Sequence, residues 1–597
     1  MDILIENGVI IDGSGHDRYL GDVWLKDDRI YKIGTGLGGE FPKASGEVVD
    51  ARGKYVIPGL IDMHSHADVT MPAYPGMENY LVQGVTTLSV GHCSMGLAPI
   101  DEYYASQCLE DLAYQAIGEG SKNGYNPGQP IVAETARLRP IFKETLGFDL
   151  DWTTWKEFMD HMQKEGVGCN IRGYVSFGMI RLQAMHGDCA RSATPEEIEE
   201  MRRLLVREME GGAHGMHCGF DYMPDLYATP EEVAAVASVL KDYDAVLEAH
   251  TQHSKLRYGK MWPEHKARDG IRELMDIGKA AGVAVHISHI PDDYLGAPEI
   301  DEAASEVSAR EILEMIRQYQ ADGLKVTFDV IPPDCMSMLY YPQMASFFMP
   351  LLLQEGGMTP FSRRLAEDER YRQWILECIR QKHLDEVCNI YPTFRRFLSD
   401  PEGKRTRDIV VTHTAIPQVT GKTLGELEEL WKMSVPEVIL EILAKDPQAS
   451  YHSSHVPSIS GGEHVFIADS EASVGFDSVA ADFSYNVAGP DFPLDTCPPN
   501  DYNFMVKYLT ENKLDRFEDA IYKASGRSAD ILGLKDRGRI AEGMKADVVI
   551  LNPDTLAPHI DFVEPRRAPS GIEAVFVNGV AAVRDGRLTG ARAGEVL

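Results

Sequence analysis

Strand and helix patterns alternate through the middle of this 597-residue chain, and that alternation restricts the fold more than any other feature. Short apolar runs that predict buried strands are followed by amphipathic segments with helix-start signals. In one such segment Thr194 is a candidate N-cap, Pro195 takes the first helical position, and Gly211-Gly212 ends the helix. Eight strands are predicted in this way, at residues 56–63, 85–91, 170–177, 213–219, 245–250, 283–289, 325–331 and 472–477. Eight parallel strands with helices between them predict an α/β fold, a (β/α)8 barrel of the TIM type.

Both ends of the chain differ from the middle and are rich in short β-type runs. Residues 1–55 contain "DILIENGVIIDG" and "GDVWLKDDRIYKIG", and Asn7-Gly8 indicates a turn between strands. Residues 543–597 repeat the style with "KADVVILNP" and "IEAVFVNGV". We therefore expect the two ends to meet in one small β-sandwich domain.

The remaining residues, 56–542, are expected to form the barrel domain. The stretch between the last two predicted strands is too long for a single crossover, so an insertion is expected around 335–470. An insertion at this position could cover the barrel mouth as a lid.

Composition excludes several classes of partner. The formal net charge of −34 would repel nucleic acid and anionic membranes. No run of about 18 apolar residues is present, so no transmembrane helix is expected, and the N-terminus lacks the basic region of a signal peptide. Nine scattered cysteines, an odd number, do not suggest a disulfide framework, so we expect a cytoplasmic protein. The expected partner is a small-molecule amide substrate, and a homo-oligomer is compatible with the sequence.

Metal-competent side chains end five of the eight predicted strands. His64 and His66 close the first strand, and because residues i and i+2 of a strand share a face, both imidazoles point the same way. The ends of the second, fifth, sixth and eighth strands carry His92-Cys93, His250, His289 and Asp477. Since the carboxyl ends of barrel strands surround one cavity, the sequence predicts a metal site there.

The donor types indicate which metal and which reaction. A thiolate with imidazoles suits zinc, and the metal would deprotonate Cys93. Zinc activates water and polarises carbonyl oxygens. Asp477 would take the proton of the water and later give it to a leaving amine. The constellation therefore predicts hydrolysis of an amide-type bond.

Other histidines and cysteines near the strand ends are weaker candidates as ligands. His217-Cys218 ends the predicted fourth strand and is a rival for a place in the site. His253 and His286 lie three residues from His250 and His289, so strand alternation turns them to the opposite face.

These motifs resemble the amidohydrolase superfamily and, within it, the D-aminoacylase (N-acyl-D-amino-acid deacylase) family. The matching stretches include "VDARGKYVIPGLIDMHSHAD", "YLVQGVTTLSVGHCSMGLAPI", "AVHISH" and "DRGRIAEGMKADVVILNPDTL". The resemblance extends over nearly the whole chain except the insertion. The resemblance implies one or two zinc ions. The tighter site would be held by Cys93, His250 and His289, and the weaker one by His64 and His66 with Cys93 bridging and Asp477 nearby as the catalytic acid and base. Related cyclic amidases bridge their metals with a carboxylated lysine of strand 4, and the absence of lysine from "GAHGMHCGFDY" supports Cys93 as the bridge.

The chain departs from the family pattern where the substrate would bind. The family typically carries an arginine two residues after the strand 5 histidine, where this chain has Gln252. It carries a lysine shortly after the strand 6 histidine, where this chain has Pro291-Asp292-Asp293, and His-Pro-Arg after the strand 8 aspartate, where "FDSVAADFSYNVAGPDFP" has no arginine. Those cations are natural partners of an α-carboxylate. The substrate is therefore expected to differ from a standard N-acyl-D-amino acid, being neutral or cationic or having its carboxylate elsewhere.

Several residues are candidates for substrate contact in place of the missing cations. Arg181, Lys255 and Arg257 could act as replacement anchors, and Tyr222 and Gln252 could also contact the substrate.

Two further functions remain open at this point. A cyclic amidase that opens a lactam, imide or hydantoin-like ring would use the same metal site. A metal-free binding scaffold on this fold has no physical need for all six predicted metal-site residues.

Overall fold

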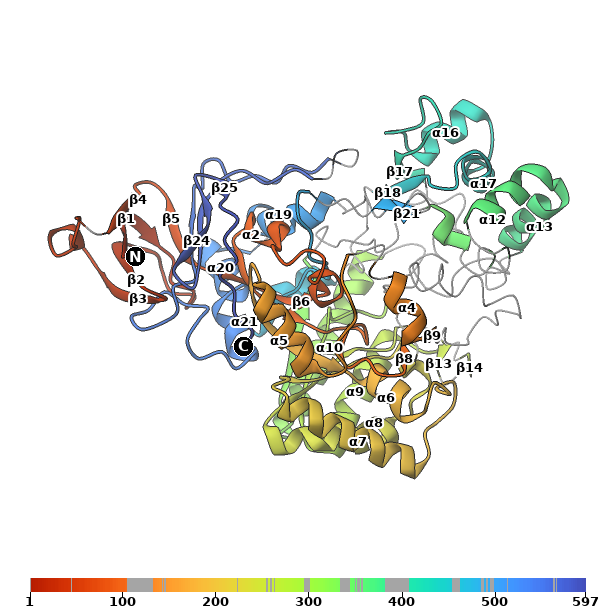
Figure 1. The fold of residues 1–597 in the computed structure, drawn as a ribbon, viewed down its shortest axis with the longest axis horizontal. Helices are drawn as coiled ribbons and strands as arrows, with labels where there is room; N and C mark the ends of the chain where they lie inside the picture. The colour runs from red at the N-terminus through yellow and green to blue at the C-terminus, as the bar shows by residue number, and fades with distance from the viewer. Residues whose placement is uncertain are drawn as a thin grey trace.

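The protein, seen in a computed structural model, has three parts: a parallel barrel, a sheet built from both termini, and an insertion between the last two barrel strands (Figure 1). The structure describes residues 2–44, 46–104, 133–141, 143, 147–222, 224–253, 256–257, 260–261, 264–294, 301–332, 344–348, 351, 355, 358–381, 407–453, 462–484, 488–489, 492–493, 499–512, 514–561, 564 and 566–597.

The barrel consists of eight parallel strands, as the sequence predicts. Each strand pairs with its sequence neighbour in the order β19-β16-β15-β12-β11-β10-β7-β6. Their bounds are β6 Leu60–Ser65, β7 Val85–Val90, β10 Asn170–Ser176, β11 Gly215–Gly219, β12 Val246–His250, β15 Ala284–Ile287, β16 Val326–Val330 and β19 Ala472–Val474.

The ring of strands closes between β6 and the chain that follows β19. A parallel bridge pairs Ser65 with Ser478, and the backbone N–H of Asp477 donates to the His64 carbonyl over 2.8 Å. The last barrel strand, β19, joins the first, β6, less regularly than the other strands join their neighbours, because β19 ends at Val474 and Asp477 lies in the turn beyond it. The predicted strand 472–477 is therefore three residues too long.

The predicted first strand, 56–63, is in fact two strands. Tyr55–Pro58 forms β5, which pairs with the terminal sheet, and β6 begins at Leu60. Gly59 separates them, and its backbone N–H donates to the Asp547 carbonyl over 2.7 Å. The apolar character of a segment does not reveal that its two halves belong to different sheets.

Helices cover the barrel and begin where the sequence predicts. The Thr194 side chain accepts from the backbone N–H of Glu197 in a capping box, and Thr229 caps the next helix through Glu232. The helices of the barrel and its surroundings are α1 Ala67–Thr70, α2 Glu78–Leu81, α4 Thr135–Ile141, α5 Trp155–Glu165, α6 Phe177–Ala184, α7 Pro195–Glu210, α8 Pro230–Ala237, α9 Ala267–Ala281, α10 Glu302–Ala321, α18 Glu463–Ala468, α19 Phe504–Glu511, α20 Phe517–Lys523 and α21 Gly526–Ile531. Every described helix is too short or too polar to traverse a lipid bilayer.

Both chain ends contribute to one nine-stranded sheet, which confirms that the termini meet. Its strands are β1 Ile3–Ile10, β2 Tyr19–Lys26, β3 Arg29–Gly34, β4 Glu47–Asp50, β5, β22 Val548–Leu551, β23 Ile572–Val577, β24 Val580–Arg584 and β25 Arg587–Leu588. Alternate residues of β22 divide between two cores: Val548 and Ile550 pack within the terminal sheet, whereas Val549 and Leu551 join the large core shared with the barrel. The sheet therefore rests on the barrel through one face.

The expected turn at Asn7-Gly8 is wrong. Strand β1 runs through both residues, and the register against β2 shifts between Ile5 and Gly8, which is a bulge. Asn7 has a φ of 63° there, so the same residue preference that marks a turn also suits a bulge.

An insertion with its own hydrophobic core lies between β16 and β19. It includes α12 Met358–Glu367, α13 Glu369–Arg380, β17 Ile409–His413, α16 Leu424–Trp431, α17 Val435–Lys445 and β18 Ser450–Ser453. These elements form a group to one side of the barrel, at the upper right of Figure 1. The unit lies where the sequence predicts an insertion, and both the bounds 335–470 and a role as a lid stay predictions.

We predict that G59A destabilises the protein by about 1–3 kcal/mol, because an added Cβ would meet Thr86 Oγ1 at 2.1 Å where the two sheets separate. Thermal denaturation of the purified protein measures the effect. G39A is the matched control, since a Cβ at Gly39 has no neighbour within 4 Å. Equal melting temperatures for the two variants would contradict this account.

Candidate metal centre

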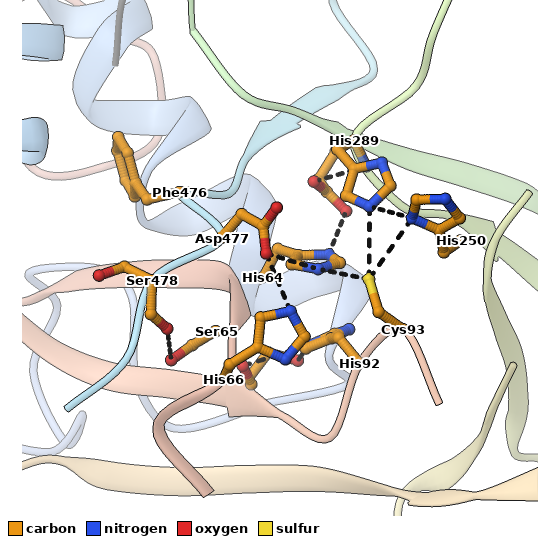
Figure 2. Close-up of polar contacts among 12 residues, drawn as sticks. His64, Ser65, His66, His92, Cys93, His250, His289, Phe476, Asp477 and Ser478 are labelled. Atoms are coloured by element: carbon orange, nitrogen blue, oxygen red, sulfur yellow. Dashed lines mark hydrogen bonds and ion pairs between the residues drawn. The ribbon is translucent and has the colours of Figure 1, made fainter. Parts of the chain in front are cut away.

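Cys93 occupies the centre of a ring of imidazoles at the carboxyl ends of the barrel strands (Figure 2). Its Sγ lies 3.5 Å from His289 Nε2 and 3.6 Å from His250 Nδ1, and these two nitrogens are 2.9 Å apart. On the other side His64 Nε2 lies 3.4 Å from the sulfur. All four side chains are buried. One sulfur and three ring nitrogens therefore converge on a small volume, and this is a donor set that zinc prefers.

A second group of donors adjoins the first through His64. His66 Nε2 lies 2.9 Å from Asp477 Oδ1, and the same carboxylate oxygen lies 3.7 Å from His64 Nε2. Two sets of ligand atoms, His64–Cys93–His289 and His64–His66–Asp477, are each mutually within 4.8 Å. The five predicted ligands and Asp477 are thus brought together as the sequence indicated.

The backbone at this site is held in conformations that few residues adopt. Cys93, His289 and Asp477 have φ values of 53°, 32° and 57°. Positive φ in non-glycine residues is uncommon and tends to persist where surrounding structure enforces it, often at functional sites. All three residues follow the end of a strand, so their side chains turn from the strand line toward the common volume.

Glycine allows the last strand to approach the ring. A Cβ at Gly475 would lie 2.5 Å from His64 Cβ and 2.7 Å from Asp329 Oδ1. Only a residue without a side chain lets the chain leading to Asp477 pass so close to His64.

Two buried carboxylates fix the ends of the strands that carry the ligands. Asp62 Oδ1 accepts from the backbone N–H groups of His64, over 3.0 Å, and Phe476, over 3.1 Å. Asp329 Oδ1 accepts from the backbone N–H of His289 over 3.0 Å, and its Oδ2 lies 3.9 Å from His64 Nδ1. These bonds position ligands without taking the nitrogen and sulfur atoms that face one another.

Burial determines the protonation states of the histidines and the cysteine in this group. It lowers the pKa of His64 well below its ordinary value and that of His289 to about 4, so both imidazoles are neutral, which is the form that coordinates metals. Burial also raises the pKa of the Cys93 thiol, and nearby carboxylates, Asp477 first, add to the rise. The thiol therefore needs an adjacent cation to ionise, and a metal supplies one.

Asp477 behaves differently from the thiol. Burial alone would raise its pKa, but the hydrogen bond with His66 and the neighbouring imidazoles outweigh burial and hold the pKa well below its ordinary value. The carboxyl group is therefore ionised and able to accept a proton.

The candidate substrate residues fall in different surroundings. Tyr222 lies at the site, with its hydroxyl 3.2 Å from His250 Nδ1. Gln252 is buried two residues beyond His250, and its backbone carbonyl contacts His265 Nε2 over 3.1 Å. Lys255 lies outside the described residues, and the side chain of Arg257 is likewise not described.

The expectation that Arg181 anchors a substrate is wrong on its geometry. Its side chain is fully buried; Nε donates to Glu232 over 2.6 Å and the terminal nitrogens donate to the carbonyls of Cys189, Pro224 and Arg191. This guanidinium holds the segments around α6 together, so it is not offered to a ligand.

The two acidic residues that replace the family's lysine region are also engaged in structure. Asp293 pairs with Arg268, and Asp292 accepts from the Ser305 hydroxyl and from the backbone N–H of Tyr294. Both carboxylates hold the chain against helices α9 and α10.

Residues dismissed or weighed as ligands turn out to support the site. His286 Nε2 lies 2.9 Å from Asp329 Oδ2, on the aspartate that fixes His289. The rival His217 accepts at Nδ1 from the backbone N–H of Ser94, which holds the loop after Cys93. Strand alternation misplaced His286 because His289 lies beyond the end of β15.

The sequence interpretation named His92 beside Cys93 but missed its buried neighbour Glu248. The imidazole of His92 stacks on His64 with ring centroids 4.2 Å apart, and its Nδ1 lies 3.4 Å from Glu248 Oε1. Glu248 precedes His250 by two residues, as Asp62 precedes His64, so both carboxylates share a strand face with a ligand. A carboxylate two residues before a predicted ligand is the sequence signal that could have revealed Glu248 and Asp62.

Comparisons with known proteins show that the chain is similar to amidohydrolases. A family model described as "Amidohydrolase family" matches residues 47–99 and 487–583. D-aminoacylase from Alcaligenes xylosoxydans xylosoxydans is 25% identical over 598 residues, which cover 100% of this chain and 97% of that protein. Over its whole length the chain resembles the D-aminoacylase family of the amidohydrolase superfamily.

Two further proteins extend the comparison for this D-aminoacylase-like chain. The crystal structure of N-acyl-D-glutamate deacylase from Bordetella bronchiseptica, complexed with zinc and a phosphonate inhibitor, has the same fold, with a TM-score of 0.65 at 22% identity over 100% of this chain and 99% of that one. D-hydantoinase from Ralstonia pickettii is 41% identical over 164 residues, 27% of this chain and 33% of that protein. The similarity to D-aminoacylases supports the chain as a hydrolase of C–N bonds other than peptide bonds.

For Asp62 we predict that D62A is destabilised by about 1–3 kcal/mol for each backbone N–H left without a partner, whereas D62N folds with little loss. Asparagine keeps an acceptor oxygen, and burial raises the pKa of Asp62 well above its ordinary value, so an uncharged side chain suits the position. Thermal denaturation of both variants beside the parent checks this. A stable D62A would show that the two bonds are dispensable.

Proposed function

We propose that this D-aminoacylase-like protein is a zinc-dependent enzyme that hydrolyses a small-molecule amide other than a standard N-acyl-D-amino acid. The observation that carries the proposal is the convergence of Cys93, His250 and His289 on one volume, with Asp477 at its edge. The solved relative with zinc and a phosphonate inhibitor supports the choice of metal.

The residues present fit one or two zinc ions. Cys93, His250 and His289 would hold the tighter ion, and His64 with His66 and a bridging Cys93 would hold the weaker one. A bound zinc ion would supply Lewis-acid activation of the attacking water and of the amide carbonyl.

The residues of the chain would then carry the proton and the orientation. Asp477, ionised and 2.9 Å from His66, would accept the proton of the water and return it to the leaving amine. Tyr222 would place its hydroxyl beside the reacting carbonyl, since that hydroxyl already lies 3.2 Å from His250 Nδ1. Gln252 would line the pocket behind His250.

The charge of the substrate can be inferred from cationic side chains that the site lacks or that are engaged elsewhere in the protein. Glutamine replaces the arginine expected after His250, and Arg181 is bound to Glu232 inside the protein. A carboxylate next to the scissile bond would therefore lose the partners that the family usually offers. This supports a substrate that is neutral or cationic near the reacting amide.

A cyclic amidase is the second candidate, because part of the chain is 41% identical to a D-hydantoinase. A ring amide has no free α-carboxylate, which suits the absence of the usual cations.

We also propose that residues 1–55 with 543–597 and residues 56–542 form the two domains, and that the 335–470 insertion covers the barrel mouth. We propose in addition that the protein is cytoplasmic.

For catalysis we predict that D477N retains zinc and loses turnover by about 10²–10⁴-fold, because the amide of asparagine cannot accept the proton. Zinc is measured by elemental analysis and turnover on whichever amide the parent hydrolyses. As a comparison, zinc is removed from the parent enzyme with a chelator, which should abolish turnover until zinc is restored. A zinc-free parent or a nearly fully active D477N would disprove the assignment.

On the substrate we expect neutral linear amides or cyclic imides and hydantoins to be turned over faster than N-acyl-D-amino acids. A panel of the three classes, assayed at equal enzyme concentration, decides the order. Robust D-selective hydrolysis of N-acyl-D-amino acids would show that Gln252 and Pro291 do not alter the specificity. Turnover confined to ring substrates would select the second candidate.

A further inference from the structure

His250 has different partners at its two ring nitrogens. Nδ1 faces the metal volume, 3.6 Å from Cys93 Sγ and 2.9 Å from His289 Nε2. Nε2 points away from that volume and lies 3.2 Å from Asp221 Oδ2. Because a neutral imidazole carries one proton, the nitrogen that binds a metal must be the unprotonated one, and the other then donates a hydrogen bond.

The side chain of Asp221 is itself held in place. It is buried, with 3% of its surface exposed, and Oδ2 also accepts from the backbone N–H of His253 over 2.9 Å. The preceding residue, Phe220, donates its backbone N–H to the His250 carbonyl over 3.0 Å, which ties the end of β11 to the end of β12. A rigid carboxylate at the end of the neighbouring strand β11 therefore faces the Nε2 side of the His250 imidazole.

We infer that Asp221 is a positioning residue that fixes the tautomer and orientation of His250 as a zinc ligand. A carboxylate that accepts from the far nitrogen of a ligating histidine keeps the proton away from the metal side and makes the imidazole a stronger ligand. This inference rests on the zinc site proposed above, and it assigns to Asp221 a role that the ligand pattern alone does not reveal.

An outer cation site is the competing explanation for the same residues. Ligand atoms of Asp221, His250 and His253 lie within 4.8 Å of one another. Coordination there would require His250 to bind through Nε2, and an imidazole already bound through Nδ1 could do so only after losing its remaining proton. A hydrogen bond from Nε2–H to Asp221 satisfies both nitrogens without that loss.

The test measures zinc affinity directly, by competition with a chromogenic chelator, in the full-length protein. For D221A we expect the zinc dissociation constant of the tighter site to rise about 10–100-fold. D221N keeps an acceptor oxygen without its charge and should fall between D221A and the parent. In the cobalt-substituted protein, the visible absorption bands should shift in both variants, because the geometry of the imidazole ligand changes.

H253A is the matched control, since it removes a ring that packs on His250 but keeps the backbone N–H that Asp221 accepts. It should bind zinc with the affinity and stoichiometry of the parent. Loss of one bound ion in H253A would reveal the outer cation site and overturn the inference.

The remaining outcomes separate the two proposals. A folded D221A with the affinity of the parent overturns the inference and leaves the zinc enzyme standing. If D221A does not fold, D221N decides, and an unshifted cobalt spectrum together with an unchanged affinity overturns the inference. A parent protein without zinc affinity refutes the proposed function, and this inference with it.

Discussion

A single carboxylate oxygen joins the first barrel strand to the chain that follows the last one. Asp62 Oδ1 accepts from the backbone N–H of His64 and from that of Phe476, and the Asp477 N–H returns a bond to the His64 carbonyl. Regular strand pairing is weakest here, because β19 ends at Val474. The side chains of His66 and Asp477 meet only because this closure fixes both segments. The contacts that close the barrel between β6 and the chain after β19 therefore also position the side chains of the site.

The barrel interior beneath the ring is unusually polar. Barrels of this type commonly fill their interior with branched apolar side chains, whereas here Glu248, His92, His286 and Asp329 are completely buried. Among the described residues, neither carboxylate oxygen of Glu248 has a hydrogen-bond partner, and burial raises its pKa well above the ordinary value. Buried polar groups of this kind weaken a fold, so their presence next to His64 and His250 reflects the needs of the site rather than of the core.

The sequence predicted the site better than its surroundings. The alternation of strands and helices located eight barrel strands to within a few residues, and the shared position of polar residues at their ends placed Cys93, His250, His289 and Asp477 together. Such residues can be found because a barrel brings corresponding points of successive units to one cavity. The run at 56–63 was misread because its apolar character is the same in two different sheets.

Long-range partners could not be predicted in the same way. Arg181 carries the charge of a substrate anchor, and only its contacts with Glu232 and three carbonyls show that it is structural. Likewise Asp221 and Asp329 contribute through hydrogen bonds to residues far along the chain. A local pattern contains the residue types but not the distances between them.

The left-handed backbone at Cys93, His289 and Asp477 also limits how such a chain can evolve. Asparagine, aspartate and histidine tolerate this conformation, whereas β-branched residues strongly disfavour it. Few amino-acid exchanges at these positions would therefore be neutral, even in a descendant that no longer needed the chemistry. Divergence of function in this lineage should accumulate in the segments around the strand ends, while the ends themselves change slowly.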